Sequence, residues 1–117
     1  MDYTYIEPDK ISEMLFDESE YVIEFCEAGV LSFTEFKDNF HNHLLDRNMK
    51  QLREAGHKIK PGAKMMGADE VVDNYEKAKV RLEEDAPDEE LKELVDTMDS
   101  ICATIIDELE HLAQNPE

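Results

Sequence analysis

His57 lies in the most basic part of an otherwise acidic chain. The 18 residues from Arg47 to Lys64 hold six bases and one acid, a local charge of +5, whereas the other 99 residues together carry −23. A neutral imidazole is a nucleophile, and neighbouring cations would stabilise an incoming anionic group such as a phosphoryl group. This combination predicts covalent chemistry at His57 with an anionic reactant.

Helical spacing places four of these bases on the same side as His57. In a helix that turns by about 100° per residue, Lys50 and Lys64 lie within about 20° of His57. Arg53 and Lys60 lie within about 60° of it. We call Lys50, Arg53, Lys60 and Lys64 the basic stripe. Like charges three or four residues apart repel one another, so an anionic partner would account for the stripe.

The elements that must position His57 are helices. Apolar residues recur at helical spacing through almost the whole chain, and no stretch alternates with period two. Short connections between long helices imply antiparallel neighbours. We therefore predict an all-α protein, an antiparallel four-helix bundle with a short extra N-terminal helix. The expected helices are 8–15 for the short one and 18–45, 47–66, 69–84 and 88–113 for the bundle.

Each bundle helix carries an apolar stripe that we expect to face the core. Asp17 is expected to cap the first of these helices, Gly29 to allow close approach to a neighbour, and Gly67 to end the second. In chain order the four stripes are Val22, Cys26, Gly29, Phe33, Phe36, Phe40 and Leu44; Leu52, Ala55, Ile59, Ala63 and Met66; Val72, Tyr75, Ala78 and Leu82; and Leu91, Leu94, Val95, Met98, Ile101, Cys102, Ile105, Leu109 and Leu112.

Composition narrows the class of protein. A chain of 117 residues fits one domain, here 1–117. The net charge of −18 argues against nucleic acid and against an anionic membrane surface as partners. No segment approaches the roughly 18 apolar residues of a membrane span, and the first residues do not resemble a signal peptide. Cys26 and Cys102 both fall on apolar stripes, so we expect free core thiols in a cytoplasmic protein. The apolar stripes are accounted for within one chain, so we expect a monomer.

Residues 55–67, AGHKIKPGAKMMG, resemble the signature of histidine-containing phosphotransfer (HPt) domains. That pattern is His-x-Leu/Ile-Lys, then small residues, then a glycine ten positions after the histidine. Here these places hold His57, Ile59, Lys60, Gly62-Ala63 and Gly67. The resemblance extends over nearly the whole chain, because HPt domains are four-helix bundles with an exposed mid-helix histidine.

The resemblance implies a relay of phosphoryl groups in a two-component phosphorelay. His57 would accept the group from the aspartyl phosphate of a receiver domain, in a response regulator or hybrid histidine kinase, and pass it to another receiver. Lys60 would stabilise the phosphoryl group, with Lys64 in a similar electrostatic role. Such a protein binds no ATP and is not an autonomous enzyme. No metal or cofactor is expected on this chain, and the Mg²⁺ would belong to the receiver. The residues expected to dock the receiver are Lys50, Arg53, Pro61, Gly62 and Ala63.

One position departs from the HPt pattern. The residue after the lysine is commonly glycine in the family, and here it is Pro61. Proline has no amide hydrogen, so it cannot donate to the carbonyl four residues back, which belongs to His57. We therefore expect Pro61 to affect the rate of phosphoryl transfer through His57.

Three other functions fit parts of the sequence. Glu54/His57 and Glu108/His111 have the Glu-x-x-His spacing of di-iron carboxylate bundles, although the first pair falls on the cation-lined face. A sensor-kinase dimerisation domain also has a helical histidine, but it usually has an acid directly after it, where this chain has Lys58. A bundle that docks an acidic partner through the basic stripe, with no chemistry, is the remaining alternative.

Overall fold

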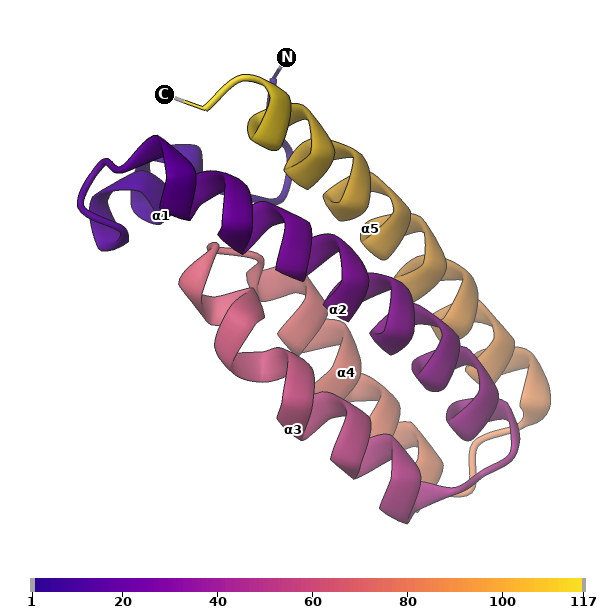
Figure 1. Ribbon diagram of the computed structural model, residues 1–117. Helices are drawn as coiled ribbons and strands as arrows, with labels where there is room; N and C mark the ends of the chain where they lie inside the picture. Colours follow the sequence, from indigo (N-terminus) through magenta and orange to yellow (C-terminus); the bar gives the residue numbers. More distant parts are fainter. Residues whose placement is uncertain (1, 117) are drawn as a thin grey trace.

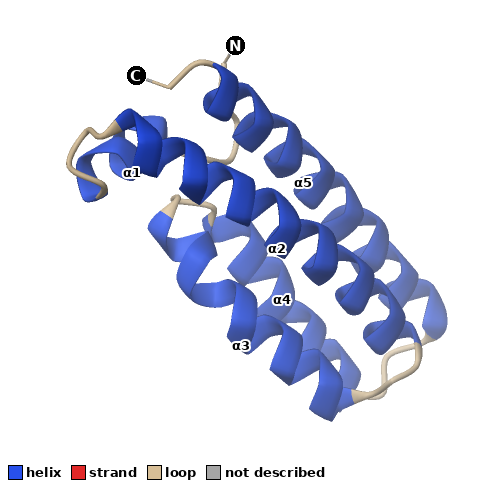
Figure 2. Cartoon of the chain, in the orientation of Figure 1, coloured by secondary structure: helices blue, strands red, loops and turns tan. Residues whose placement is uncertain are grey.

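The computed structural model describes residues 2–116, and this part of the chain is all-helical, without strands. Met1 and Glu117, the ends of the expected domain, lie outside the described residues. Loops are confined to the short connections and the two ends (Figure 2). The five helices are α1 (Pro8–Met14), α2 (Ser19–Leu45), α3 (Met49–Met65), α4 (Asp69–Glu83) and α5 (Asp88–Gln114).

The four long helices lie side by side, and α1 lies beside the first turns of α2 (Figure 1). Helix α2 packs on α3 and α5, and α4 packs on the same two helices. Each of α2 and α5 has 27 residues, and at about 1.5 Å per residue each spans most of the 46 Å length of the molecule. No helix within residues 2–116 is both long enough and apolar enough to cross a membrane.

The predicted apolar stripes form the core, with one correction in α4. All predicted core residues of α2, α3 and α5 are buried. In α4, however, Val71 is buried and Val72 is only half-buried, as is Leu82. Adjacent residues on a helix point about 100° apart, and Val71 has the four-residue spacing to Tyr75 that places both on the core side. The prediction of Val72 as the core residue is therefore wrong.

Small and polarisable residues in α2 and α5 behave as expected. Gly29 is buried, and a Cβ atom there would lie 2.9 Å from Leu109 Cδ1, so glycine permits the close approach of α5. Cys26 and Cys102 are both free and buried. Burial raises the pKa of the Cys26 thiol to about 11 and that of Cys102 to about 12, so both remain protonated at neutral pH.

The two predicted helix signals differ in outcome. Gly67 ends α3 with a φ of +82°, and the amides of Gly67 and Ala68 donate to the carbonyls of Lys64 and Ala63. This pattern is a Schellman motif and confirms the prediction. Asp17 does not cap α2: the chain turns there in the left-handed region (φ 57°), and the N-cap residue is Glu18, which has no side-chain cap bond. Asp17 belongs to the turn that follows α1, so its side chain is not placed to cap the first amides of α2.

A buried carboxylate of α5 holds the N-terminal segment. Glu108 is only 2% exposed, and its carboxylate accepts hydrogen bonds from the backbone amides of Thr4 (2.7 Å), Tyr5 (3.0 Å) and Ile6 (3.1 Å). The next amide, that of Glu7, donates to the carbonyl of Met66 at the end of α3. The segment therefore links the C-terminal half of α5 to the turn between α3 and α4.

Glu108→Gln is expected to loosen this segment. The amide side chain has one acceptor oxygen in place of two, so the Thr4 amide would face an NH₂ group and remain unsatisfied. Such a loss costs about 1–2 kcal/mol. Urea unfolding should show a loss of stability of this size, and hydrogen exchange should accelerate first at the amides of residues 4–6. Unchanged exchange at these amides would contradict this role of Glu108.

Candidate functional site

Helix α3, which carries His57, begins two residues later than predicted. Asn48 is its N-cap, and the side-chain oxygen of Asn48 accepts from the amide of Gln51 at 3.1 Å. Arg47, predicted as the first residue of the helix, instead lies in the connection with a φ of +56°. An asparagine one residue later is a good cap, and it sets the start of the helix.

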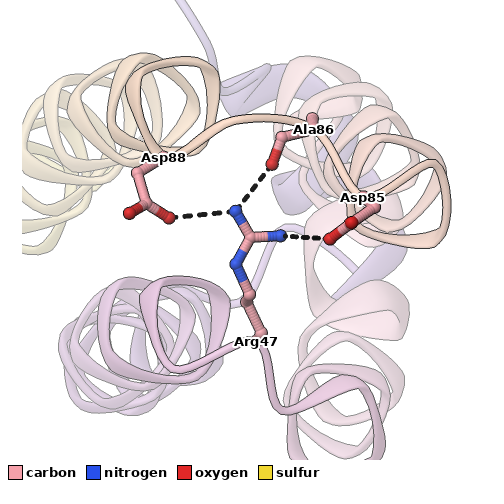
Figure 3. A network of polar contacts seen from close by, with 4 residues as sticks. All are labelled: Arg47, Asp85, Ala86 and Asp88. Carbon is pink, nitrogen blue, oxygen red and sulfur yellow. Dashed lines mark hydrogen bonds and ion pairs between the residues drawn. The ribbon is translucent and has the colours of Figure 1, made fainter.

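Arg47 does not belong to the basic surface around His57. Its guanidinium lies at the end of the molecule where α2 joins α3, and there it contacts the connection between α4 and α5 (Figure 3). It donates to Asp85 (3.1 Å), to the carbonyl of Ala86 (2.6 Å) and to Asp88 (2.9 Å). This arginine joins two loops that are 38 or more residues apart in sequence, so its charge has a structural partner.

The imidazole of His57 is exposed on the middle of α3. Its side chain forms no hydrogen bond or ion pair with any other residue between 2 and 116. The preceding residue, Gly56, is buried, because the ring of Tyr75 from α4 lies directly against its Cα. Tyr75 is 3% exposed and its hydroxyl donates to the Arg53 carbonyl at 3.4 Å. Gly56 thus fixes the contact of α3 with α4 and leaves the next residue, His57, facing solvent.

Lys60, one turn after His57, is held by an acid of α4. Its Nζ lies 2.6 Å from Oε1 of Glu76, and Nζ of Lys79 lies 3.0 Å from the other carboxylate oxygen, Oε2. The two ammonium groups lie 5.8 and 4.9 Å from the centre of the Tyr75 ring, within range of cation–π attraction. The hydrogen bond from Lys60 lowers the pKa of Glu76, and the same bond raises the pKa of Lys60. Both groups are therefore charged at neutral pH.

The rest of the basic stripe divides into paired and unpaired cations. Arg53 forms an ion pair with Glu83 of α4 at 2.9 Å. Lys50 and Lys64 are exposed, and within residues 2–116 their ammonium groups have no ion-pair partner. The acids of α4 therefore neutralise half of the stripe. A single helix considered in isolation could not reveal this pairing.

Pro61, Gly62 and Ala63 have three different environments. Pro61 is exposed, and α3 continues through it to Met65. A Cβ atom at Gly62 would meet no other atom within 4 Å, so packing within the chain does not require glycine there. Ala63 is fully buried, which confirms it as a core residue. The prediction that Ala63 also contacts a partner is wrong, because its methyl group has no exposed surface.

A small cleft lies between α2 and α3, and the residue after His57, Lys58, is part of its lining. The ion pair of Lys58 with Glu35 (2.9 Å) forms part of its wall, together with Phe36 and Ile59. Its volume of about 80 Å³ is far below the 300–1,000 Å³ that ligand pockets commonly have. This cleft is therefore too small to enclose a ligand of ordinary size.

The residues proposed for a di-iron site have other surroundings. Glu54 and His57 are exposed on α3, whereas the Glu108 carboxylate is engaged by three backbone amides. His111 Nδ1 lies 2.8 Å from the Tyr3 hydroxyl. In the part of the chain that the structure describes, no three His, Cys, Asp or Glu side chains are placed to hold a metal ion.

Three residues near His57 were not singled out as functional from the sequence: Gly56, Glu76 and Lys79. The pair Glu76/Lys79 has the three-residue spacing of a helix ion pair, but such pairs are common on exposed helices. Only the packing of α4 on α3 brings them to Lys60.

Comparison with protein-family models, with curated proteins and with solved structures finds no match to this chain.

Proposed function

We propose that this chain is a histidine-containing phosphotransfer protein of a two-component phosphorelay. His57 accepts a phosphoryl group from the aspartate of one receiver domain and passes it to the aspartate of another. The observation that carries the proposal is the exposed, unbonded imidazole in the middle of α3, with Lys60 and Lys64 one and two turns further along the same helix. Pro61, exposed and about 40° from His57 around the helix, lies on the same side as the imidazole.

The same proposal includes the architecture expected of such a protein. Helices α2 to α5 form an antiparallel four-helix bundle with α1 added at one end. Three observations support this topology: the connections between the long helices have only three or four residues, α2 and α4 each pack on both α3 and α5, and the chain alternates between the two ends of the molecule (Figure 1). Short connections between packed helices favour antiparallel neighbours.

The transfer is a substitution at phosphorus. The lone pair of His57 Nε2 attacks the phosphorus of the receiver's aspartyl phosphate, an N–P bond forms, and the bond from phosphorus to the aspartate oxygen breaks. The aspartate leaves as a carboxylate, and His57 Nδ1 keeps its proton. The second transfer is the reverse substitution, with the carboxylate of another receiver as the nucleophile. Lys60 and Lys64 stabilise the negative charge of the phosphoryl oxygens.

Complementary surface charge attracts the receiver domain to the face of α3 that carries His57. Receiver domains hold an acidic pocket with Mg²⁺, and the unpaired Lys50 and Lys64 on either side of His57 complement it. Arg53, Pro61 and Gly62 complete the contact surface around the imidazole. The protein acts as a cytoplasmic monomer whose partners are receiver domains of response regulators or hybrid kinases.

Phosphoramidate tests this function without a partner protein. The reagent transfers its phosphoryl group to histidine and releases ammonia. The intact mass of the treated protein should increase by one phosphoryl group, and mild acid should remove it, because N–P bonds of phosphohistidine are acid-labile whereas phosphoserine esters are not. A receiver domain should then remove the group at neutral pH.

The alternative function is a bundle that docks an acidic partner without chemistry. The exposed and unpaired Lys50 and Lys64 also favour such docking. A folded protein that takes up no phosphoryl group, either from phosphoramidate or from a phosphorylated receiver, would establish this alternative.

Lys60→Ala is expected to slow phosphorylation of His57 about tenfold, because the phosphoryl group loses its nearest cation. The fold should persist, since the Lys60 side chain lies at the surface beside Glu76. The initial rate of phosphoramidate labelling gives the measurement, and Lys92→Ala, an exposed lysine of α5, serves as the control. Equal rates in the two variants would remove Lys60 from the site.

A further inference from the structure

The contact between α3 and α4 beside His57 has two cations and a single bridging acid. Glu76 presents one carboxylate oxygen to Lys60 at 2.6 Å and the other to Lys79 at 3.0 Å. These ammonium groups come from different helices, so the cluster exists only when α3 and α4 are packed together. Its net charge is +1, because the single carboxylate neutralises only one of the two cations.

The Tyr75 ring holds the two cations in place. It is buried against Gly56 at the base of the cluster, and both ammonium groups lie over it, at 4.9 and 5.8 Å from its centre. Cation–π attraction to a fixed ring restricts where flexible lysine side chains lie. The ring therefore gives both ammonium groups a fixed common neighbour besides the Glu76 carboxylate.

The carboxylate of Glu76 can leave, whereas the ring cannot. Glu76 is 43% exposed and reaches the cluster through a flexible side chain, so it can rotate into solvent at small cost. Two ammonium groups that each hold one oxygen of a carboxylate can equally hold two oxygens of a phosphoryl group. A dianionic phosphoryl group also matches the two positive charges better than a monoanionic carboxylate does.

We propose that Lys60 and Lys79 form a two-lysine phosphoryl-binding site across α3 and α4, in which Glu76 is an internal competitor for the phosphoryl group. The inference rests on the proposed function and adds two residues to it. Lys79 becomes a second phosphoryl ligand from a different helix. Glu76 weakens the hold on the group, which keeps phosphohistidine from becoming a stable end point and favours onward transfer.

Binding of inorganic phosphate tests the site independently of covalent chemistry. Phosphate is titrated into the ¹⁵N-labelled protein, and the chemical shifts of residues 56–60 and 75–79 report binding. Glu76→Gln is expected to tighten binding about two- to fivefold, the range expected for one exposed ion pair. Lys79→Met added to Glu76→Gln should abolish the gain.

The matched control is Glu84→Gln. Glu84 also lies at α4, is exposed and pairs with a cation of the same helix, Arg81, at 3.5 Å. The Glu84→Gln substitution removes the same unit of negative charge as Glu76→Gln but leaves Lys60, Glu76 and Lys79 unchanged. If Glu84→Gln tightens phosphate binding as much as Glu76→Gln, the effect is one of net charge and the proposed competition is overturned. A gain that persists in the double variant would likewise overturn the role of Lys79. Thermal melting of each variant confirms that it is folded.

Labelling with phosphoramidate separates this inference from the proposed function. If phosphate binds as expected but His57 takes up no phosphoryl group, the two-lysine site stands as an anion site and the phosphotransfer function fails. If His57 is labelled but Glu76→Gln does not tighten phosphate binding, the function stands and the competition by Glu76 fails. If both hold, Glu76→Gln should also lengthen the lifetime of phosphohistidine, again more than Glu84→Gln does.

Discussion

His57→Gln is expected to abolish phosphorylation by phosphoramidate while leaving the fold unchanged. Glutamine keeps a polar side chain of similar size but has no nucleophilic ring nitrogen, so no N–P bond can form. The imidazole is exposed and makes no hydrogen bond or ion pair with the other described residues. The free energy of unfolding should therefore change by no more than about 0.5 kcal/mol. Intact mass and urea unfolding give the two measurements.

His43→Gln is the matched control. His43 is a partly exposed histidine of α2, and phosphoramidate would label it if accessibility alone decided reactivity. Labelling should persist in this variant and disappear only in His57→Gln. An acid-labile phosphoryl group retained by His57→Gln would assign the nucleophile to another residue and refute the proposed relay.

Gly56→Ala is expected to destabilise the protein by about 1–3 kcal/mol, although alanine is the better helix former. In isolation the substitution would favour the helix by up to about 1 kcal/mol. Here the new methyl group would overlap the Tyr75 ring, which is 3% exposed and bonded through its hydroxyl to the Arg53 carbonyl. Overpacking of this kind costs about 1–3 kcal/mol and occasionally more, so we expect it to exceed the gain. Urea unfolding monitored by circular dichroism measures the change.

Gly62→Ala tests the same substitution on the same helix without the overlap. No atom lies within 4 Å of a Cβ atom built at Gly62, so only the helix preference remains, and stability should rise by up to about 1 kcal/mol. The two variants should thus change stability in opposite directions. If both stabilise, the ring of Tyr75 moves aside freely, and Gly56 does not fix the contact between α3 and α4.

Helices and core positions were largely predictable because both depend on local periodicity. A residue on the buried stripe of α2 or α5 is specified by its spacing from the previous one, and the burial of Phe33, Phe40 and Leu109 follows from that spacing alone. Helix ends were predictable where a single residue dominates, as Gly67 does through its positive φ. The prediction of Asp17 as the cap was wrong because the backbone turns there in the left-handed region (φ 57°) after α1, and the spacing of residues within one helix does not report such a turn.

The sequence by itself predicts that His57 is exposed, on which side of α3 it lies, and that this helix is positively charged. All three properties depend only on positions within α3. The pairing of that charge was decided only by tertiary structure. Packing of α4 on α3 brings Glu76 and Lys79 to Lys60, and Glu83 to Arg53. Arg47, counted with the basic segment by its position in the chain, instead joins two loops. Electrostatic interactions depend on distances through space, and these become defined only when helices far apart in sequence are packed together.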